Sequence, residues 1–454
     1  MDFLFQRKVR IRRKVRIRLL FIFTIVLFPS VAKAMGLVST LKYSVDHSPI
    51  IIESYSDIET GKSKLELAKS ASRPKISVSG GYIVMNKPAS MEIPSISLPM
   101  LGSLSLGGMD LTKENMAIGM ASVVYPVYTG GRISHAKNEA KSLIKASENA
   151  SEEIKLEVGY GALKAYLGLL LAKENLDVRR QYSETVAEHV KNAKKLFEQK
   201  QIAKYDVMRA EAEYENSLSA LKEAENKVEL TKSLLLNIIG AEEANFEFDD
   251  IDKCFLFEDL KYKKFDELFE NALINSSKIK ALEAKLDIYT EGKMRAKAEK
   301  TPIVSLFDSQ IISNEQPMKM PNQIAGVLVN IPVYDGGESK AKIDEKISLI
   351  KKTETEIVKA KNDLRYEIET YLSDISSAES VIASADKSIE VAREGLRLAE
   401  RRFNECVGSG IEVKDASTTL SGAELYKFSA LYKYRVALCG LAKTQGRFWE
   451  LTEK

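Results

Sequence analysis

Proline is absent from two long stretches of this chain of 454 residues. All eleven prolines lie at positions 29, 49, 74, 88, 94, 99, 126, 302, 317, 321 and 332, which leaves residues 127–301 and 333–454 without one. Because proline interrupts helix interiors, both stretches can form very long helices. Apolar residues such as Leu163, Tyr166 and Leu170 recur there at three- and four-residue steps. A helix from Ser134 to Phe197 would be about 96 Å long, which exceeds a compact domain and favours coiled coils.

Cysteine and histidine are also scarce, which bears on catalysis and metal binding. Cys254, Cys406 and Cys439 are odd in number and widely spaced, which argues against a disulfide framework or a zinc site and favours small packing residues. His47, His135 and His189 also lie far apart and lack the spacing of metal ligands or of a His-based catalytic site. The sequence also contains neither a phosphate-binding loop nor a G-x-S-x-G element. We therefore expect no enzyme activity, no metal and no cofactor.

Long apolar runs are absent beyond the N-terminal region. Residues 7–18 are strongly basic, residues 19–28 are apolar and Ala32-Lys33-Ala34 follows, which is the order of a secretory signal peptide. Ten apolar residues reach only about 15 Å as a helix, so a permanent anchor is the weaker alternative. A nucleic-acid-binding arm is disfavoured, because the basic run directly precedes the apolar segment. We predict a signal peptide over residues 1–34, whose removal leaves a net charge of about −5 and no expected nucleic-acid partner.

The hexapeptide PVYTGG at 126–131 returns as PVYDGG at 332–337 and belongs to a longer repeat. The same offset of 206 residues matches Phe197 with Phe403, Val207 with Val413 and Gly240 with Gly446. Before the hexapeptides, helical runs that end at Pro74 and Pro302 match at an offset of 228. We predict an internal duplication, with structural repeats over residues 35–240 and 265–446, an irregular connector over 241–264 and a C-terminal tail over 447–454.

Near the prolines, the spacing of the apolar residues changes from the three- and four-residue steps of a helix to every second residue, as in a strand. Apolar and small or polar residues alternate over about 75–85, 116–128, 302–312 and 323–334. Strands of ten to thirteen residues have the length that a tilted membrane-spanning strand requires. Each repeat is therefore predicted to contain a helix, two membrane β-strands joined by a Pro/Ser/Gly-rich loop, and a long helical hairpin.

This order of elements, found twice with its PVY-x-GG turns, resembles the TolC family of outer-membrane efflux proteins. The resemblance covers nearly the whole chain after the signal peptide and includes Asp415-Ala416-Ser417-Thr418-Thr419-Leu420. It implies a mixed α+β membrane fold: a homotrimer in the outer-membrane lipid, in which each protomer gives four strands to a 12-stranded β-barrel that a long α-helical coiled-coil barrel continues through the periplasm. It also implies the exit duct of a tripartite efflux or type I secretion system, with a periplasmic adaptor (membrane fusion) protein and an inner-membrane transporter of RND or ABC type as partners.

Physical chemistry leads to association independently of the resemblance. Four strands cannot close on themselves, and open strand edges in lipid leave unpaired backbone groups that cost several kcal/mol each. Strands from other copies can supply the missing partners. The alternative function is a structural coiled-coil envelope protein without a conducting lumen, which would leave the signal peptide and the membrane-length strands unexplained.

The resemblance further implies a periplasmic gate at Glu412 and Asp415, which stand where relatives carry a pair of acidic residues. A spacing of three places both carboxylates on one helix face, and threefold symmetry would bring six into a narrow lumen that favours cations. The alternative is an ordinary first helical turn, where acidic residues suit the helix dipole. The first repeat has Asp206 and Arg209 at the matching positions, so it lacks an acidic pair.

Two further sets of residues follow from the resemblance. Relatives usually have a glycine where Lys200 and Cys406 stand, so we expect Gly408 and Gly410 to serve the second turn instead. Contact with the adaptor is expected at the hairpin tips, at Phe197, Lys200, Phe403, Gly408 and Gly410. The passage from strand to helix is expected at Pro126, Tyr128, Gly130, Gly131, Pro332, Tyr334, Gly336 and Gly337.

Overall fold

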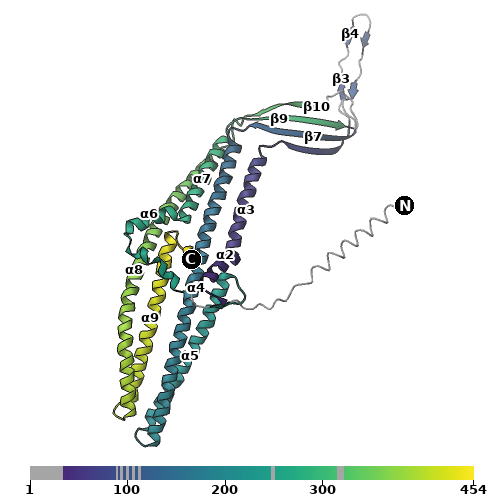
Figure 1. Cartoon of the computed structure of the whole chain (residues 1–454). Coiled ribbons are helices and arrows are strands. Elements are labelled where there is room, and N and C mark those ends of the chain that lie inside the picture. The colour runs from purple at the N-terminus through teal and green to yellow at the C-terminus, as the bar shows by residue number, and fades with distance from the viewer. Residues whose placement is uncertain are drawn as a thin grey trace, which may run out of the picture.

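The chain is strongly elongated, with a small sheet at one end and two helical hairpins that extend away from it (Figure 1). The computed structural model describes residues 34–87, 90–92, 96–98, 102–104, 108–110, 114–246, 251–313 and 322–453. Except for Ala34, the predicted signal peptide lies outside these residues. The first described residues form β1 (Ala34–Met35), which pairs in parallel with β8 (Asn245–Phe246).

Four helices form the two hairpins, and they occupy the proline-free stretches as predicted. Helices α4 (Arg132–Glu198) and α8 (Glu338–Asn404) each contain 67 residues, and they are followed by the returning helices α5 (Lys204–Ile239) and α9 (Gly410–Thr444). Buried alanines on α8 stand seven residues apart at 378, 385, 392 and 399, which is the repeat of a coiled coil. No helix in the described part of the chain is both long and apolar enough to cross a membrane.

Shorter helices surround the upper half of the hairpins. Helices α3 and α7 both pack on α4, and α7 also packs on α8. Pro49 opens α3 at a position where its missing N–H costs nothing, and Ser276 caps α7 by accepting a hydrogen bond from the Ile279 N–H at 3.3 Å. The bounds of these elements are α2 (Leu37–His47), α3 (Pro49–Ser70), the 3-10 helix η1 (Ile251–Tyr262), α6 (Phe265–Asn275), α7 (Ser277–Ala298) and α10 (Glu450–Glu453).

The sheet contains four antiparallel strands in the order β10-β9-β7-β2, so β10 and β2 are its edges. Its strands are β2 (Lys75–Val84), β7 (Asn115–Tyr128), β9 (Ile303–Ser313) and β10 (Gln323–Asn330). Large apolar side chains are open to the surroundings on these strands, with Ile76 at 76% and Val78 at 81% exposure. Four short strands extend the loop between β2 and β7: β3 (Ser90–Glu92), β4 (Ile96–Leu98), β5 (Gly102–Leu104) and β6 (Gly108–Asp110).

The two strands that lead into the long helices end differently. Strand β10 stops at Asn330, four residues before the predicted end at 334, because Pro332 has no N–H to donate to the ladder. Strand β7 continues through Pro126 to Tyr128, and its pairing with β9 shifts register between these two residues. An irregularity of this kind accommodates a proline that regular pairing would reject.

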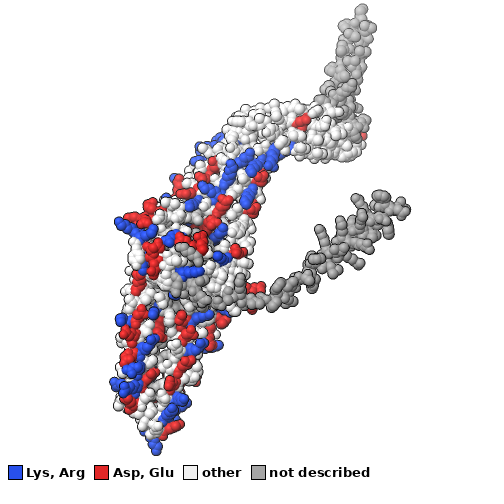
Figure 2. Space-filling view, in the orientation of Figure 1, with Lys and Arg blue, Asp and Glu red and all other residues white. Residues whose placement is uncertain are grey.

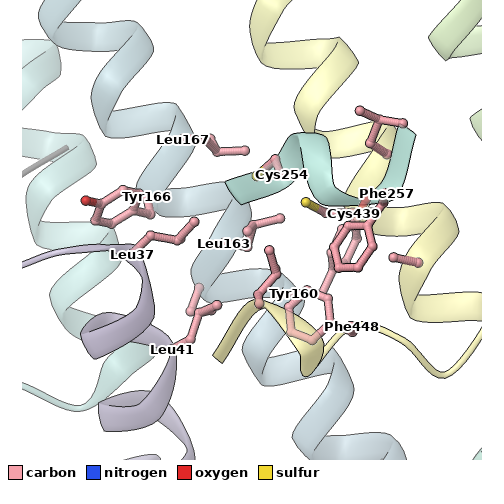
Figure 3. Packing of buried hydrophobic residues seen from close by; sticks show 14 of the residues in the cluster. Leu37, Leu41, Tyr160, Leu163, Tyr166, Leu167, Cys254, Phe257, Cys439 and Phe448 are labelled. Atoms are coloured by element: carbon pink, nitrogen blue, oxygen red, sulfur yellow. The ribbon is translucent and has the colours of Figure 1, made fainter. Parts of the chain in front are cut away.

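The main hydrophobic core lies midway along the molecule, where α2, α4, α9 and η1 meet (Figure 3). The segment 241–264 was predicted to be irregular. The structure shows a 3-10 helix within it, which contributes Cys254 and Phe257 to this core. The segment 447–454, predicted to be a tail, also contributes to the core through Phe448 and Leu451. Burying an aromatic or leucine side chain stabilises a fold by roughly 1.5–3 kcal/mol, so both segments hold the hairpins together at this level.

Candidate functional site at the hairpin tips

The turns of the two hairpins lie at the end of the molecule farthest from the sheet and share one backbone geometry (Figure 1). Lys200 has a φ of 61° and Cys406 a φ of 57°, and no other non-glycine residue in the described ranges has a positive φ. Each donates its N–H to the carbonyl of the aromatic residue three positions earlier: Lys200 to Phe197 at 2.8 Å and Cys406 to Phe403 at 3.0 Å. The left-handed conformation costs a residue with a side chain about 1–2 kcal/mol, which the rest of each turn offsets.

Gly408 and Gly410 do not provide the turn in the way that we expected. Neither has a positive φ, so Cys406 itself takes the left-handed position. Both glycines are instead required by close packing. A Cβ on Gly408 would lie 2.9 Å from the Cβ of Arg402, and one on Gly410 would lie 3.0 Å from Nε2 of His189.

The two tips pack against each other through an aromatic contact between Phe403 of the second hairpin and His189 of the first. Phe403 is 4% exposed, and its ring centroid lies 4.4 Å from that of His189 on α4. The equivalent Phe197 is 40% exposed. A small cluster of buried residues surrounds Phe403: Val190, Ala193, Val207, Ala210, Ala399 and Val413.

Polar side chains join the first hairpin to α9 directly beside this cluster. Lys414 Nζ lies 2.7 Å from Glu213 Oε2, and the Tyr182 hydroxyl donates to Glu213 Oε1 at 2.7 Å. Tyr182 also lies 3.4 Å from the Thr418 hydroxyl. Although burial opposes the effect, the hydrogen bonds from Lys414 and Tyr182 lower the pKa of Glu213. This residue therefore stays ionised as the central acceptor between the hairpins.

A narrow cavity of about 80 Å³ lies between these contacts and the turn of the second hairpin. Its walls come from α4, α5, α8 and α9, so it lies at the contact between the two hairpins. Burial lowers the pKa of His189, which keeps its imidazole neutral in this position. The charged groups around the cavity are Asp206, Arg209, Glu213 and Lys414.

The predicted acidic pair lies on the open face of the first turns of α9. Glu412 and Asp415 are exposed, whereas Val413 and Ser417 are buried on the opposite face against the other helices. The Ser409 hydroxyl accepts the Glu412 N–H at 3.4 Å, so Glu412 also occupies an ordinary helix start. Arg402 Nε lies 3.4 Å from Glu412 Oε2 within the same hairpin.

Tyr182, His189, Glu213 and Lys414 were not predicted as site residues. They lie inside long helices whose sequence shows only ordinary alternation of polar and apolar residues. Lys414 stands between the two predicted acids, and this proximity is the one signal that the sequence offered.

The predicted passages from strand to helix contain left-handed glycine pairs. Gly130 and Gly131 have φ values of 59° and 86°, and Gly336 and Gly337 have values of 65° and 92°. Gly131 and Gly337 are the N-caps of α4 and α8. A side chain on Gly130 would overlap the side chain of Thr301, whereas Gly336 has open space around it. Gly130 at the first junction is therefore packed against Thr301, between α7 and β9, whereas Gly336 at the second has no such neighbour.

Asp335 replaces a conventional helix cap at the second junction. Its carboxylate accepts hydrogen bonds from the N–H groups of Gly337 and Ser339, both at 3.0 Å. The hydrogen bonds from Ser339 and the Gly337 N–H lower the pKa of Asp335 to about 2. Tyr334 is 88% exposed beside it, and Tyr128 at the first junction is 53% exposed.

Charge is distributed unevenly over the molecule. On the face shown in Figure 2, Lys, Arg, Asp and Glu side chains cover the helices densely, whereas the sheet is nearly free of them. Within the described residues, no group of three or more His, Cys, Asp or Glu side chains could hold a metal ion. An apolar sheet joined to charged helices suits one part in lipid and the other in water.

Comparison with known proteins places the chain in a family. The model of the outer membrane efflux protein family matches residues 268–447. Outer membrane protein TolC of Vibrio cholerae is 21% identical over 398 residues, which cover 84% of each protein. The chain belongs to the TolC family of outer-membrane efflux proteins.

Solved structures share the fold of this TolC-family chain. The outer membrane protein VceC of Vibrio cholerae has a TM-score of 0.72 at 14% identity, covering 90% of this chain and 96% of VceC. The CmeC outer membrane channel of Campylobacter jejuni has a TM-score of 0.73 at 16% identity, covering 91% of this chain and 86% of CmeC.

The family membership confirms the predicted function at the level of the family. The chain is an outer-membrane efflux channel, a transport protein and not an enzyme, with a long periplasmic helical portion. Four antiparallel strands and long helices in one chain match structures of trimeric outer-membrane channels. The alternative of a structural rod without a lumen is thereby set aside.

Proposed function

We propose that three copies of this chain form one conducting duct, with a 12-stranded barrel in the outer membrane and a helical barrel in the periplasm. The observation that carries the proposal is the open sheet, whose edges β2 and β10 have no partner strand among the described residues. Unpaired edge groups in lipid are costly, and pairing β2 of one protomer with β10 of the next removes both edges. The exposed apolar side chains of the strands then face lipid.

The proposed duct has pseudo-sixfold symmetry if the two halves of the chain are copies of one unit. Matching lengths of α4 and α8 support this duplication, since each contains 67 residues. Matching backbone features support it too: Lys200 and Cys406 at the turns, and Gly240 and Gly446 after the returning helices, all have positive φ. Six junctions of the PVY-x-GG type would then surround one pore, with Tyr128 and Tyr334 at the membrane interface, where tyrosine is favoured.

Glu412 and Asp415 are the proposed gate and selectivity residues. Both carboxylates are exposed on one protomer and lie near the tips, so threefold symmetry can place six of them around the narrow end of the duct. The contact between Arg402 and Glu412 offsets part of this charge within each protomer. A ring of negative charge favours cations and repels anions.

The proposed partners act at the hairpin tips and beyond them, at the end of the periplasmic portion that lies away from the outer membrane. An adaptor protein would contact the exposed tips at Phe197, Lys200, Gly408 and Gly410, with Phe403 as the buried support of that surface. An inner-membrane transporter of RND or ABC type would supply the energy. Deleting the gene separates these classes, because loss of efflux raises drug susceptibility whereas loss of type I secretion removes proteins from the medium.

Single-channel recording tests the duct directly. The purified protein, shown by native mass spectrometry to contain three chains, is inserted into a planar lipid bilayer. We expect discrete conductance steps with a preference for K⁺ over Cl⁻. A trimer that inserts but passes no current would contradict the proposal.

The gate is tested by Glu412→Ala combined with Asp415→Ala in the same recording. Removing the carboxylates lowers the negative potential at the narrow end, so we expect a higher conductance or a weaker preference for cations. Glu390→Ala is the control, because it removes an exposed acid in the last third of α8, away from the turn, that pairs with Lys387. Currents equal to those of the wild type in an intact trimer would remove these two residues from the gate.

A further inference from the structure

Two of the three cysteines, far apart in sequence, meet in the main core. Cys254 lies on η1 and Cys439 on α9, and both side chains are 0% exposed. Figure 3 shows them next to each other between η1 and α9. Burial and, after it, the neighbouring Cys254 side chain raise the pKa of the Cys439 thiol. The structure contains them as free thiols.

The compartment determines what adjacent thiols become. The helical portion of this channel lies in the periplasm, which is an oxidising environment in which protein disulfides form and persist. Two thiols that lie next to each other in the folded core need little backbone movement to form a bond. The spacing of the cysteines along the sequence gives no indication of this pairing.

We propose that Cys254 and Cys439 form a disulfide bond that joins η1 to α9 in the exported protein. The oxidant is a disulfide of the thiol–disulfide oxidoreductase class. One cysteine thiolate attacks a sulfur of that disulfide, and the second thiolate then attacks the mixed disulfide. The protein loses two protons and two electrons, one S–S bond forms in the protein and one breaks in the oxidant, which leaves as a dithiol.

The reaction has to take place before the core closes. Both side chains are inaccessible in the folded chain, and a thiol with a raised pKa is a poor nucleophile. Oxidation therefore accompanies folding after export, and the finished bond is shielded from reductants.

The bond would stabilise a part of the core that has little regular structure of its own. Segment η1 is a 3-10 helix of 12 residues, a conformation with poorer hydrogen bonds than an α-helix. It is otherwise held by packing and by surface ion pairs such as Lys261 with Glu379 and Arg447 with Asp259. A covalent link between distant segments also restricts the unfolded chain. It would fix the base of α9 while leaving the tip of that helix free to move.

Thiol counting tests the proposal on the purified full-length trimer. The protein is denatured without reductant, treated with N-ethylmaleimide and analysed by mass spectrometry. We expect one label per chain, on Cys406, and three labels after reduction. Cys406 is a suitable internal reference because it is exposed at the hairpin tip, where its thiol donates to Gln201 Oε1 at 3.1 Å.

Two variants make the result specific to this pair. Without reductant, the Cys406→Ala protein should carry no N-ethylmaleimide label. The Cys439→Ala protein should leave Cys254 as a free thiol and therefore carry two labels per chain. Native wild-type trimer should also retain its disulfide in a reductant until denaturant is added. Three labels per chain without reductant, a chain-to-chain disulfide, or a separate small-molecule adduct on each cysteine would overturn the proposal.

Discussion

At the scale of single residues, the main core depends on glycines that face aromatic rings. A Cβ on Gly440 would contact the Tyr371 ring and lie 2.7 Å from the Tyr160 hydroxyl. These rings cannot move freely, because they pack edge to face with centroids 6.5 Å apart and the Tyr371 hydroxyl donates to Glu367 at 2.9 Å. Glycine in a helix interior is normally destabilising relative to alanine. Its role at position 440 is therefore to leave room for the two tyrosine side chains.

Gly440→Ala should destabilise the protein although alanine is the better helix former. We expect overpacking to cost about 1–3 kcal/mol. Gly422→Ala on the same helix is the control, since nothing lies within 4 Å of its Cβ position, and it should stabilise by up to about 1 kcal/mol. Unfolding followed by circular dichroism separates the two, and equal stability of both variants would show that the core can absorb the methyl group.

At the scale of the elements, the contact between the two hairpins is sensitive to acid. His189 packs against Phe403 and has a pKa below its ordinary value of 6.5 because it is buried. The folded contact therefore binds fewer protons than the separated helices, and its stability falls as the pH drops below 6.5. The neighbouring carboxylate acts in a lower window, because the pKa of Glu213 lies below its ordinary value of 4.5 and its contribution is lost only there.

We expect hydrogen exchange at the second tip to accelerate as the pH falls from about 7 to 5, after correction for the intrinsic exchange rate. His189→Phe should keep the packing and remove this dependence, whereas His47→Gln, on α2 away from the tips, should leave it unchanged. A His189→Phe protein with the same pH response as the wild type would assign the effect to another group. Asp206, Arg209, Glu213 and Lys414 are the charged residues that line the same cavity.

At the scale of the whole molecule, one chain is an incomplete object. Its strands carry exposed apolar side chains and two open edges, while its helices carry a dense mixture of charges (Figure 2). Neither surface is stable in the environment of the other, and only association closes the sheet. The proposed trimer and its lumen therefore exist only when several copies assemble. One protomer supplies the strands and helices from which they form.

Much of this architecture could be predicted because it depends on local patterns. The absence of proline from two long stretches indicated long helices, and the helix predicted from Ser134 to Phe197 is close to the observed α4. Alternation with a period of two indicated the four strands. The left-handed glycine pairs follow from sharp turns between strand and helix, a requirement that the repeated hexapeptide already contained. The prediction was wrong where a tertiary contact determines the role of a residue. Gly408 and Gly410, for example, leave room for neighbouring side chains and do not take the left-handed position of the turn.

The sequence by itself determined the types and order of the main elements, the recurrence of the PVY-x-GG hexapeptide and the separation of apolar strands from charged helices. Tertiary structure decided which of two equivalent residues is used: Phe403 is buried against His189, whereas Phe197 is exposed. It also brought Glu213 to Lys414 and Cys254 to Cys439. Periodicity depends on neighbours along the chain and is visible in the sequence. Contacts between segments far apart in the sequence depend on how helices pack, which no local pattern encodes.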